Sequence, residues 1–574
     1  MTTSEPIGVT ATQIPLSYAS GTSAVPLLGQ TIGDAFDQTA ARFPDRLAVV
    51  SRHQGVRRTW TQLKAEVDRT ARALLGAGVG KGDRVALWSP NRLEWAVVQY
   101  ATAKVGGVLV TVDPALRTHE LRYVLEQSGA STLIIHGVHK SSDYARIVAE
   151  LVPEVRTGQP GQLHSQALPE LRRVICLDAA HAMAGMDDFA GLLALADTVG
   201  ERDLSATQQA QDFDDVACIQ YTSGTTGNPK GASLSHHSLL NNGFFVGEGI
   251  GLTEQDRIVV PVPLFHTFGM VMSNLAAMTH GAAVVYPSPT FEPTATLEAV
   301  AAERATVLHG VPTMFIAELG DRRFSEFDLS SLRTGIMAGS ICPIEVMRNV
   351  MDRMHMRDVS ICYGMTETSP VSLQTHKDAP LDKRVATVGT IHPHLEVKIV
   401  DPAGATVPRN GSGELCTRGY SVMLGYWDNP DATAQAIDRA RWMHTGDLAV
   451  MDDDGYVTIV GRIKDMIIRG GQNIYPREIE DFLYTHPAIT EAQVIGVPDE
   501  RYGEEVMAWV RLADGASLSE EDVKEFCRGS IAHYKVPRYV KFVDSFPTTA
   551  SGKIRKVAMR AEAIAELGLT GVAP

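Results

Sequence analysis

Hydrophobic and polar positions follow two recurring patterns along the first two thirds of this chain. Apolar residues return at helical spacing over 60–76, and further helical segments are expected from residue 31, at 93–104 and at 296–305. Between them lie short, continuous apolar runs, typical of strands buried on both faces of a parallel sheet. The alternation predicts an α/β fold with helix-covered parallel sheets. The runs are 47–50, 83–88, 105–112, 132–135, 173–177, 216–219, 282–286, 306–308 and 359–362.

The pattern changes after residue 387. Short alternating segments at 388–391, 396–400 and 413–417 predict an antiparallel β subdomain. A basic, hinge-like passage follows at 462–471, and the remaining chain has the α+β pattern of a small separate domain.

These patterns divide the chain into three parts. We expect a polar, irregular N-terminal arm over residues 1–30, lying on the surface. A large domain of parallel-sheet α/β subdomains and one antiparallel subdomain should cover 31–463, and a small, mobile α+β domain 464–574.

Composition narrows the class of protein and its compartment. Among 574 residues, 44% are hydrophobic and 21% charged, as in globular proteins, and the net charge of −15 argues against nucleic-acid binding. Six widely spaced cysteines without a C-x-x-C pair suit a reducing cytosol. We find neither a secretory signal nor an apolar window suited to crossing a membrane, and therefore expect a cytoplasmic protein. The sequence leaves open whether it forms a homo-oligomer.

The stretch 221–231 has the composition of an anion-binding loop. Glycines let a backbone turn sharply and point N–H groups inward, while hydroxyls and a lysine add donors to a phosphate. It is not the common phosphate loop of nucleotide hydrolases, because Pro229 occupies the place of the second glycine. The alternative is an ordinary surface loop. The candidate phosphate-binding residues are Thr222, Ser223, Gly224, Thr225, Thr226, Gly227, Asn228, Pro229 and Lys230.

Two further clusters suit a bound nucleotide. At 362–368, Tyr363 offers an aromatic face to a base, and Thr366 and Glu367 offer a hydroxyl and a carboxylate to phosphate and Mg²⁺. At 442–447, Asp447 follows a tight turn and, with Arg462, could hold ribose hydroxyls. Alone, the first is commonly a strand-to-turn transition with a capping threonine, and the second is more often an ordinary turn aspartate.

Two more clusters suit an acyl substrate and a mobile catalytic group. At 261–269, prolines and aromatics surround His266, which is either a pocket residue or a hydrogen-bonded structural histidine. At 548–553, Lys553 stands on a glycine-bearing loop that could enter a site built elsewhere, or it is a surface lysine.

Taken together, in this order and spacing, these motifs resemble the adenylate-forming superfamily of acyl-CoA synthetases, luciferases and nonribosomal adenylation domains. The resemblance runs from about residue 31 to 560. The segments 310–315, 419–427 and 467–476 look like the medium-chain fatty acyl-CoA ligase branch. It implies a two-step reaction: a carboxylate and ATP give acyl-AMP and pyrophosphate, and coenzyme A then displaces AMP after the small domain rotates.

The resemblance also implies roles for individual residues. Lys553, Thr366, Glu367 and His266 would be catalytic, with Lys553 bridging the carboxylate and the α-phosphate. Tyr363, Gly339 and Ser340 would hold adenine, Asp447 and Arg462 the ribose, and Glu367 with Thr222 the Mg²⁺. Lys464 would be the hinge, and Gly470 and Gly471 would leave room for coenzyme A. The implied apolar acyl pocket comprises Phe265, Phe268, Met270, Val311 and Met314.

These implications favour an ATP- and Mg²⁺-dependent fatty acyl-CoA ligase acting on small molecules. We expect a linear, saturated acid of roughly six to twelve carbons, because each buried methylene adds about 0.8 kcal/mol. Open alternatives are transfer of the acyl group to a carrier protein or to oxygen, and a ligase for an aromatic acid. A non-catalytic nucleotide sensor is disfavoured, since Lys553, Glu367 and Asp447 are all present.

Overall fold

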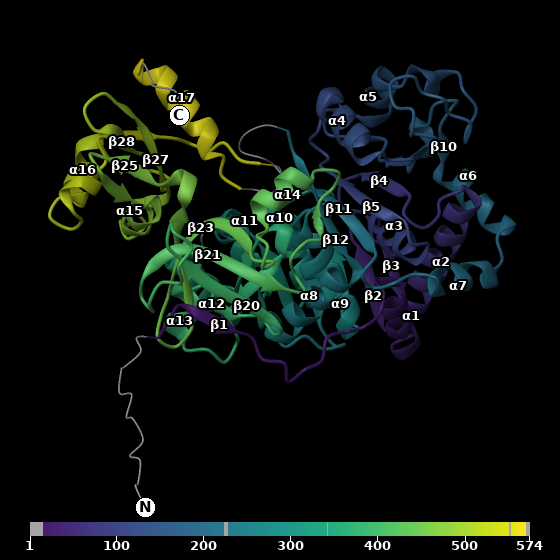
Figure 1. The fold of residues 1–574 in the computed structure, drawn as a ribbon, viewed down its shortest axis with the longest axis horizontal. Coiled ribbons are helices and arrows are strands. Elements are labelled where there is room, and N and C mark those ends of the chain that lie inside the picture. The colour runs from purple at the N-terminus through teal and green to yellow at the C-terminus, as the bar shows by residue number, and fades with distance from the viewer. Residues whose placement is uncertain (1–14, 223–227, 341, 550–552, 570–574) are drawn as a thin grey trace, which may run out of the picture.

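The computed structural model describes residues 15–222, 228–340, 342–549 and 553–569. In these residues the strands form four larger sheets and a small hairpin of β7 (Val138–His139) and β8 (Ser142–Asp143). Three of the larger sheets belong to the large domain, and the fourth lies in the C-terminal domain at the left of Figure 1.

The first sheet is α/β, as predicted. Its strands are parallel from β10 to β11, and the last two are antiparallel. Along β4, Val85 and Leu87 enter one core, whereas Ala86 and Trp88 enter another, so both faces are buried. In order, the strands are β10 (Asp187–Asp188), β9 (Arg173–Cys176), β6 (Thr132–Ile135), β4 (Arg84–Trp88), β5 (Val108–Val112), β11 (Val216–Thr222), β12 (Lys230–Ser235) and β22 (Gly425–Tyr426).

The second sheet has the same design. Its central strands are parallel, and β3, β18 and β19 add antiparallel edges. Val49 and Val50 enter different cores, which again places helices on both faces. In order, the strands are β19 (Thr390–Ile391), β18 (Val371–Gln374), β17 (Asp358–Gly364), β16 (Thr334–Ala338), β15 (Val307–Gly310), β13 (Arg257–Val259), β14 (Ala283–Tyr286), β2 (Leu47–Ser51) and β3 (Val56–Thr59).

Helices fill the spaces beside and between these two sheets (Figure 1). The predicted helices at 60–76 and 93–104 have the expected bounds, whereas the one expected at 296–305 is α10 and starts three residues earlier. The helices are α1 (Ile32–Arg42), α2 (Trp60–Gly76), α3 (Leu93–Lys104), α4 (Thr118–Ser128), α5 (Tyr144–Leu151), α6 (Phe189–Ala194), α7 (Glu201–Gln209), α8 (His236–Gly249), α9 (Ala276–His280), α10 (Pro293–Glu303), α11 (Pro312–Leu319), α12 (Ile344–Arg353), α13 (Leu381–Ala386) and α14 (Pro430–Ala436).

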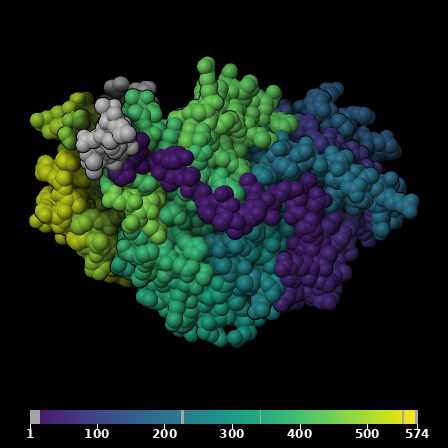
Figure 2. Space-filling model, turned by 60° about the horizontal axis from the view of Figure 1, so that its bottom comes forward, coloured from purple at the N-terminus to yellow at the C-terminus, as the bar shows by residue number. Residues whose placement is uncertain are grey.

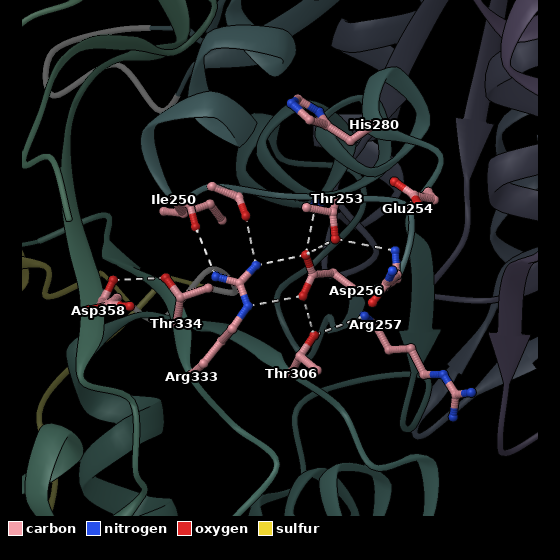
Figure 3. Close-up of polar contacts among 12 residues, drawn as sticks. Ile250, Thr253, Glu254, Asp256, Arg257, His280, Thr306, Arg333, Thr334 and Asp358 are labelled. Carbon is pink, nitrogen blue, oxygen red and sulfur yellow. Dashed lines mark hydrogen bonds and ion pairs between the residues drawn. The ribbon is translucent and has the colours of Figure 1, made fainter. Parts of the chain in front are cut away.

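A polar network closes the amino ends of four parallel strands in the second sheet (Figure 3). At its centre, Asp256 before β13 accepts hydrogen bonds from Arg333 Nη2 at 2.7 Å and Thr306 Oγ1 at 2.6 Å. Thr306 precedes β15 and Arg333 precedes β16. Thr334 Oγ1 donates to the carbonyl of Asp358, the first residue of β17, at 2.8 Å. These structural polar groups thus gather at the amino ends of the strands. Ligands of such sheets bind outside the opposite, carboxyl ends.

The third sheet is the expected antiparallel subdomain, with two differences. The segment at 388–391 forms β19, which pairs with β18 and extends the second sheet instead. The N-terminal arm is not wholly irregular, because β1 pairs with β20. In order, the strands are β1 (Tyr18–Ser20), β20 (Leu395–Val400), β21 (Ser412–Gly419), β23 (Met443–Met451) and β24 (Val457–Arg462).

The arm beyond β1 crosses the surface of the large domain, as Figure 2 shows for the purple strip at its front. The backbone N–H of Leu28 donates to Asn241 Oδ1 at 2.7 Å, and Asn241 Nδ2 donates back to the carbonyl of Leu28 at 3.1 Å. The described part of the arm therefore joins the antiparallel sheet to α8.

The C-terminal domain has its own α+β core. Residues of β27 and β28 pack into two different clusters, so its sheet is covered on both faces. A short 3-10 turn, Ile463–Asp465, connects it to β24. Its elements are β25 (Ile467–Arg469), β26 (Gln472–Ile474), α15 (Pro476–Leu483), β27 (Ile489–Asp499), β28 (Gly503–Leu512), α16 (Glu520–Cys527), β29 (Tyr539–Phe542) and α17 (Lys556–Leu567).

Among the described residues, no helix is both long and apolar enough to cross a membrane.

Candidate active site

The predicted phosphate-binding loop connects β11 and β12, which form an antiparallel hairpin. Ser223, Gly224, Thr225, Thr226 and Gly227 lie outside the described residues. At the described base of the loop, Thr222 Oγ1 donates to the carbonyl of Lys230 at 3.4 Å. Tyr123 Oη, from α4, donates to the carbonyl of Pro229 at 2.9 Å and fixes the returning strand.

Glu367 lies beside this hairpin, in a 3-10 turn (Thr366–Thr368) after the carboxyl end of β17. Its side chain is buried, and its Oε1 accepts a hydrogen bond from Tyr426 Oη at 2.8 Å. Lys230 Nζ stands 5.1 Å from the centre of the same tyrosine ring. Burial and the charge of Glu367 raise the pKa of Tyr426, which keeps it a hydrogen-bond donor.

Tyr426 therefore links the phosphate loop to the predicted magnesium ligand. Sequence reasoning did not single it out, although it lies within the segment 419–427 that carries the family resemblance. Its register partner on β12 is Ala232. This contact forms only because β12 and β22, which are far apart in the sequence, pair with each other.

The predicted ribose-binding pair is brought together by the antiparallel sheet. Asp447 and Arg462 are register partners on β23 and β24, with Arg462 Nε 3.1 Å from Asp447 Oδ1. The other carboxylate oxygen, Oδ2, accepts a hydrogen bond from Tyr363 Oη at 2.6 Å. Burial raises the pKa of Tyr363, and the charge of Asp447 raises it further. The residues proposed for adenine and ribose thus form one connected group.

Lys553 is carried into this group by the C-terminal domain. Burial lowers its pKa, the charge of Arg462 lowers it further, and the charges of Glu367 and Asp447 oppose that change. All three charged residues belong to the large domain, so the lysine faces a site that its own domain does not build. It is a half-buried side chain, not a surface lysine.

The chain around Lys553 is held at several points. Its N–H donates to Thr549 Oγ1 at 3.1 Å, and its carbonyl accepts from the N–H of Thr549 at 2.8 Å. Three residues on, Lys556 Nζ donates to Glu480 Oε1 at 2.6 Å and to the carbonyl of Val494 at 3.0 Å. Because Glu480 is buried, this ion pair anchors the start of α17 and with it the position of Lys553.

His266 lies close enough to Lys553 to respond to its charge. Burial, together with that charge, lowers the pKa of His266 to about 3, so the imidazole is neutral at physiological pH. Its Nδ1 accepts a hydrogen bond from the N–H of Phe268 at 3.3 Å, which assigns the proton to Nε2.

The segment after His266 has an unusual backbone. Phe268–Leu275 is a π-helix, a form that is frequent at functional sites. A Cβ on Gly269 would lie 2.4 Å from the carbonyl oxygen of Pro263, so only glycine permits this close packing.

Gly339 follows the carboxyl end of β16 with a φ of 93°, which favours glycine. A Cβ placed there would lie 3.1 Å from Val311 Cγ1 and 3.9 Å from Lys553 Cε. Gly339 and its exposed neighbour Ser340 thus border the space in front of Lys553, where the resemblance places the adenine.

A cavity of about 360 Å³ is lined by residues that follow strands of the first two sheets, among them Asn91 after β4 and Pro261 after β13. Of the predicted acyl-pocket residues, Phe265 and Met314 line it. Phe268, Met270 and Val311 are buried in the adjoining core instead. Sequence reasoning missed a polar end formed by Asp113, Arg117, His139, Lys140, Ser141 and Ser142.

The remaining predicted residues stand as follows. Thr366 is half-buried in the turn with Glu367. Lys464 is exposed within the 3-10 turn between the domains. Gly470 and Gly471, with φ of 57° and 80°, form the two-residue turn between β25 and β26, where positive φ is needed. The hinge and coenzyme A roles remain predictions.

Comparisons with known proteins agree with this geometry. A family model described as AMP-binding enzyme matches residues 36–427, and one described as AMP-binding enzyme C-terminal domain matches residues 478–553. YngI of Bacillus subtilis (strain 168), a protein assigned to the acyl-CoA synthetases, is 50% identical over 545 residues, covering 95% of this chain and 99% of YngI.

A second relative and a solved structure are also similar to this chain. The medium-chain acyl-CoA ligase ACSF2 of Homo sapiens, a mitochondrial protein, is 43% identical over 560 residues, covering 96% of this chain and 91% of ACSF2. The crystal structure of the anthranilate CoA ligase AuaEII in complex with anthranoyl-AMP has a TM-score of 0.84 at 26% identity, covering 95% of this chain and 99% of that one. Fold, site and sequence together make this chain a member of the AMP-binding enzyme family.

Proposed function

We propose that this protein is an ATP-dependent fatty acyl-CoA ligase, which forms an acyl-AMP with release of pyrophosphate and then transfers the acyl group to coenzyme A. The observation that supports it best is the position of Lys553, whose Cε lies 3.9 Å from the place that a Cβ would take on Gly339. The pKa of this lysine also responds to the charges of Glu367, Asp447 and Arg462. This is the arrangement needed for the first step, in which a carboxylate oxygen attacks the α-phosphorus.

In that step negative charge spreads over phosphate oxygens, and fixed positive groups lower the barrier. Lys553 would contact the α-phosphate and the attacking carboxylate, while Lys230 and the backbone of its loop would hold the other phosphates. The neutral His266 would donate from Nε2 to the carboxylate and orient it. Lys553 and His266 are both half-buried, so their interactions with the substrate would be stronger than in bulk solvent.

The nucleoside would be held by the connected group described above. The ring of Tyr363 would stack on adenine beside Gly339 and Ser340. Asp447 would accept hydrogen bonds from the ribose hydroxyls, since each of its oxygens has a lone pair beyond those used by Tyr363 and Arg462.

Glu367 fits the role of a magnesium ligand. Mg²⁺ binds through one or two carboxylates plus substrate phosphates and water. Glu367 offers such a carboxylate, with Oε1 fixed by Tyr426, and the hydroxyl of Thr222 retains a lone pair for the same ion. When bound, Mg²⁺ supplies positive charge to the phosphate oxygens.

For the second step we propose rotation of the C-terminal domain about Lys464. The supporting feature is the short turn Ile463–Asp465, which together with Met466 joins β24 to the first strand of the small domain. The turn at Gly470 and Gly471, free of side chains, would then leave room for the pantetheine arm of coenzyme A.

For the acid we propose a straight, saturated chain of medium length, bound in the cavity lined by Phe265 and Met314. Its volume of about 360 Å³ lies at the lower end of the range for small-ligand pockets, about 300–1,000 Å³. We also place the protein in the cytosol, because its six cysteines are free and buried.

The test separates the two half-reactions. Lys553→Ala should reduce acyl-AMP formation by about a hundredfold or more, because one preorganised donor is worth about 3 kcal/mol. Thioester formation from supplied acyl-AMP should be largely retained. Lys524→Ala, which changes a lysine on α16 of the same domain, serves as the control. Equal loss in both half-reactions would contradict the proposed role.

A panel of acids tests the substrate and the acceptor. Values of kcat/KM for pyrophosphate release should rise about fourfold per added methylene and then break where the chain reaches the cavity floor. A maximum at acetate or at an aromatic acid would exclude the medium-chain assignment. Trapping the adenylate with hydroxylamine, with and without coenzyme A, distinguishes coenzyme A from a carrier protein as acceptor.

A further inference from the structure

The antiparallel sheet carries a second cluster of chemically reactive side chains, away from the phosphate loop. Glu414 and Cys416 lie two residues apart on β21, so their side chains share one face of the sheet. His444, on β23, is the register partner of Cys416 and shares that face. One ligand atom from each of the three residues lies within 4.8 Å of the other two.

The sulfur–nitrogen distance suits a tetrahedral metal site, whereas the oxygen–nitrogen distance is that of a hydrogen bond. His444 Nδ1 lies 2.8 Å from Glu414 Oε2 and 3.5 Å from Cys416 Sγ. Ligands at the zinc bond lengths of about 2.0–2.3 Å stand roughly 3.3–3.8 Å apart around a tetrahedron. Side-chain rotation that lengthens the Oε2–Nδ1 distance from 2.8 Å would bring the three atoms to that spacing.

The ligand types narrow the choice of ion. A thiolate, an imidazole and a carboxylate are the ligands that Zn²⁺ takes in proteins, whereas Mg²⁺ and Ca²⁺ take oxygen atoms. Glu414 and His444 alone could be an ordinary ion pair. Cys416 packs against Val400 and Trp442, and its Sγ lies 3.5 Å from His444 Nδ1, which adds a sulfur ligand beside the nitrogen and the oxygen.

The surroundings of the cluster hold it in place while leaving access from solvent. The N–H of Gly446 donates to Glu414 Oε1 at 3.1 Å, which orients the carboxylate. About a third of the His444 side chain is exposed, at 34%, whereas Cys416 is buried. An ion could therefore enter from the histidine side, with water completing its coordination.

We propose that Glu414, Cys416 and His444 form a binding site for a divalent transition-metal ion, best fitted by Zn²⁺. On binding, the S–H proton of Cys416 passes to solvent, a zinc–sulfur bond forms, and the imidazole and the carboxylate replace water molecules on the ion. No oxidation state changes. The site is distinct from the proposed magnesium site at Glu367, which is built from oxygen ligands.

Cobalt(II) provides a direct test, because a cobalt–thiolate bond gives a charge-transfer absorption that oxygen or nitrogen ligands alone do not give. Untagged, full-length protein is treated with a chelator, titrated with Co²⁺, and then with Zn²⁺. We expect one equivalent of Co²⁺ to produce the absorption and Zn²⁺ to remove it. Absence of the thiolate band in the wild-type protein would overturn the proposal.

Matched variants locate the signal. Cys416→Ala should lose the band, whereas Cys527→Ala, which removes another buried cysteine, should keep it. Glu414→Gln, which can still bond to His444, should weaken binding about tenfold or more. Retention of the band in Cys416→Ala would refute the site. Should that variant fail to fold, unchanged zinc affinity in Glu414→Gln would refute it equally.

Discussion

Replacing Tyr426 by phenylalanine removes one hydroxyl and tests the link between the phosphate loop and Glu367. The lost hydrogen bond, 2.8 Å long, is made to a buried carboxylate. A hydrogen bond to a charged group is worth about 1.5–3 kcal/mol, and about 1.4 kcal/mol corresponds to tenfold in rate. We expect kcat/KM for acyl-AMP formation to fall about tenfold to a hundredfold, because Glu367 is no longer held for the metal.

The assay is pyrophosphate release under saturating acid with ATP and Mg²⁺ varied, beside thioester formation from supplied acyl-AMP. The second half-reaction should change little, since it needs no magnesium-bound triphosphate. Tyr18→Phe is the matched control, because Tyr18 Oη donates to a carboxylate, Glu396 Oε2, at 2.7 Å on the exposed surface. An unchanged first half-reaction, or equal loss in both, would refute the reasoning.

Three further outcomes are expected. Lys464→Pro, which fixes φ at the proposed hinge, should spare acyl-AMP formation and block the overall reaction; unchanged turnover would place the hinge elsewhere. Asp256→Asn should lower the free energy of unfolding by about 1.5–3 kcal/mol in urea titrations, because the half-exposed Arg333 loses its hydrogen bond to a buried carboxylate, with KM for ATP unchanged. Burial raises the pKa of Glu318 well above its usual range. Its neutral form therefore stabilises the fold at low pH, and that stability is lost as pH rises from about 4.5. The free energy of unfolding of Glu318→Gln, minus that of the wild type, should therefore increase by up to about 1.4 kcal/mol for each pH unit above that value. Glu326→Gln, which changes an exposed glutamate, is the control and should show no such increase.

Much of the fold could be predicted from local pattern. The buried strands of the two α/β sheets are continuous apolar runs, because both of their faces are covered. The helix at 60–76 keeps its predicted bounds, since Thr59 caps its start by accepting a hydrogen bond from the N–H of Gln62. These features depend on neighbours in sequence.

What local pattern could not supply was the choice of strand partner. The alternating pattern of the segment 388–391 suits an antiparallel strand in the second sheet as well as in the third. Only the pairing of β19 with β18 assigns the segment to the second sheet. The role of Tyr426 could likewise not be predicted, because it depends on the pairing of β22 with β12. The same reason applies to the polar end of the cavity, where Arg117 and His139 come from separate segments.

The strand pairing of the N-terminal arm has a consequence for how the protein is made. β1 at Tyr18–Ser20 hydrogen-bonds to β20 at Leu395–Val400, nearly four hundred residues later. At about 5–20 residues per second on the ribosome, this strand waits roughly 20–75 s for its partner to be synthesised. During that interval the edge of a strand is open to other chains. At three residues, β1 is short, and a short strand offers few positions for pairing with other chains while it waits.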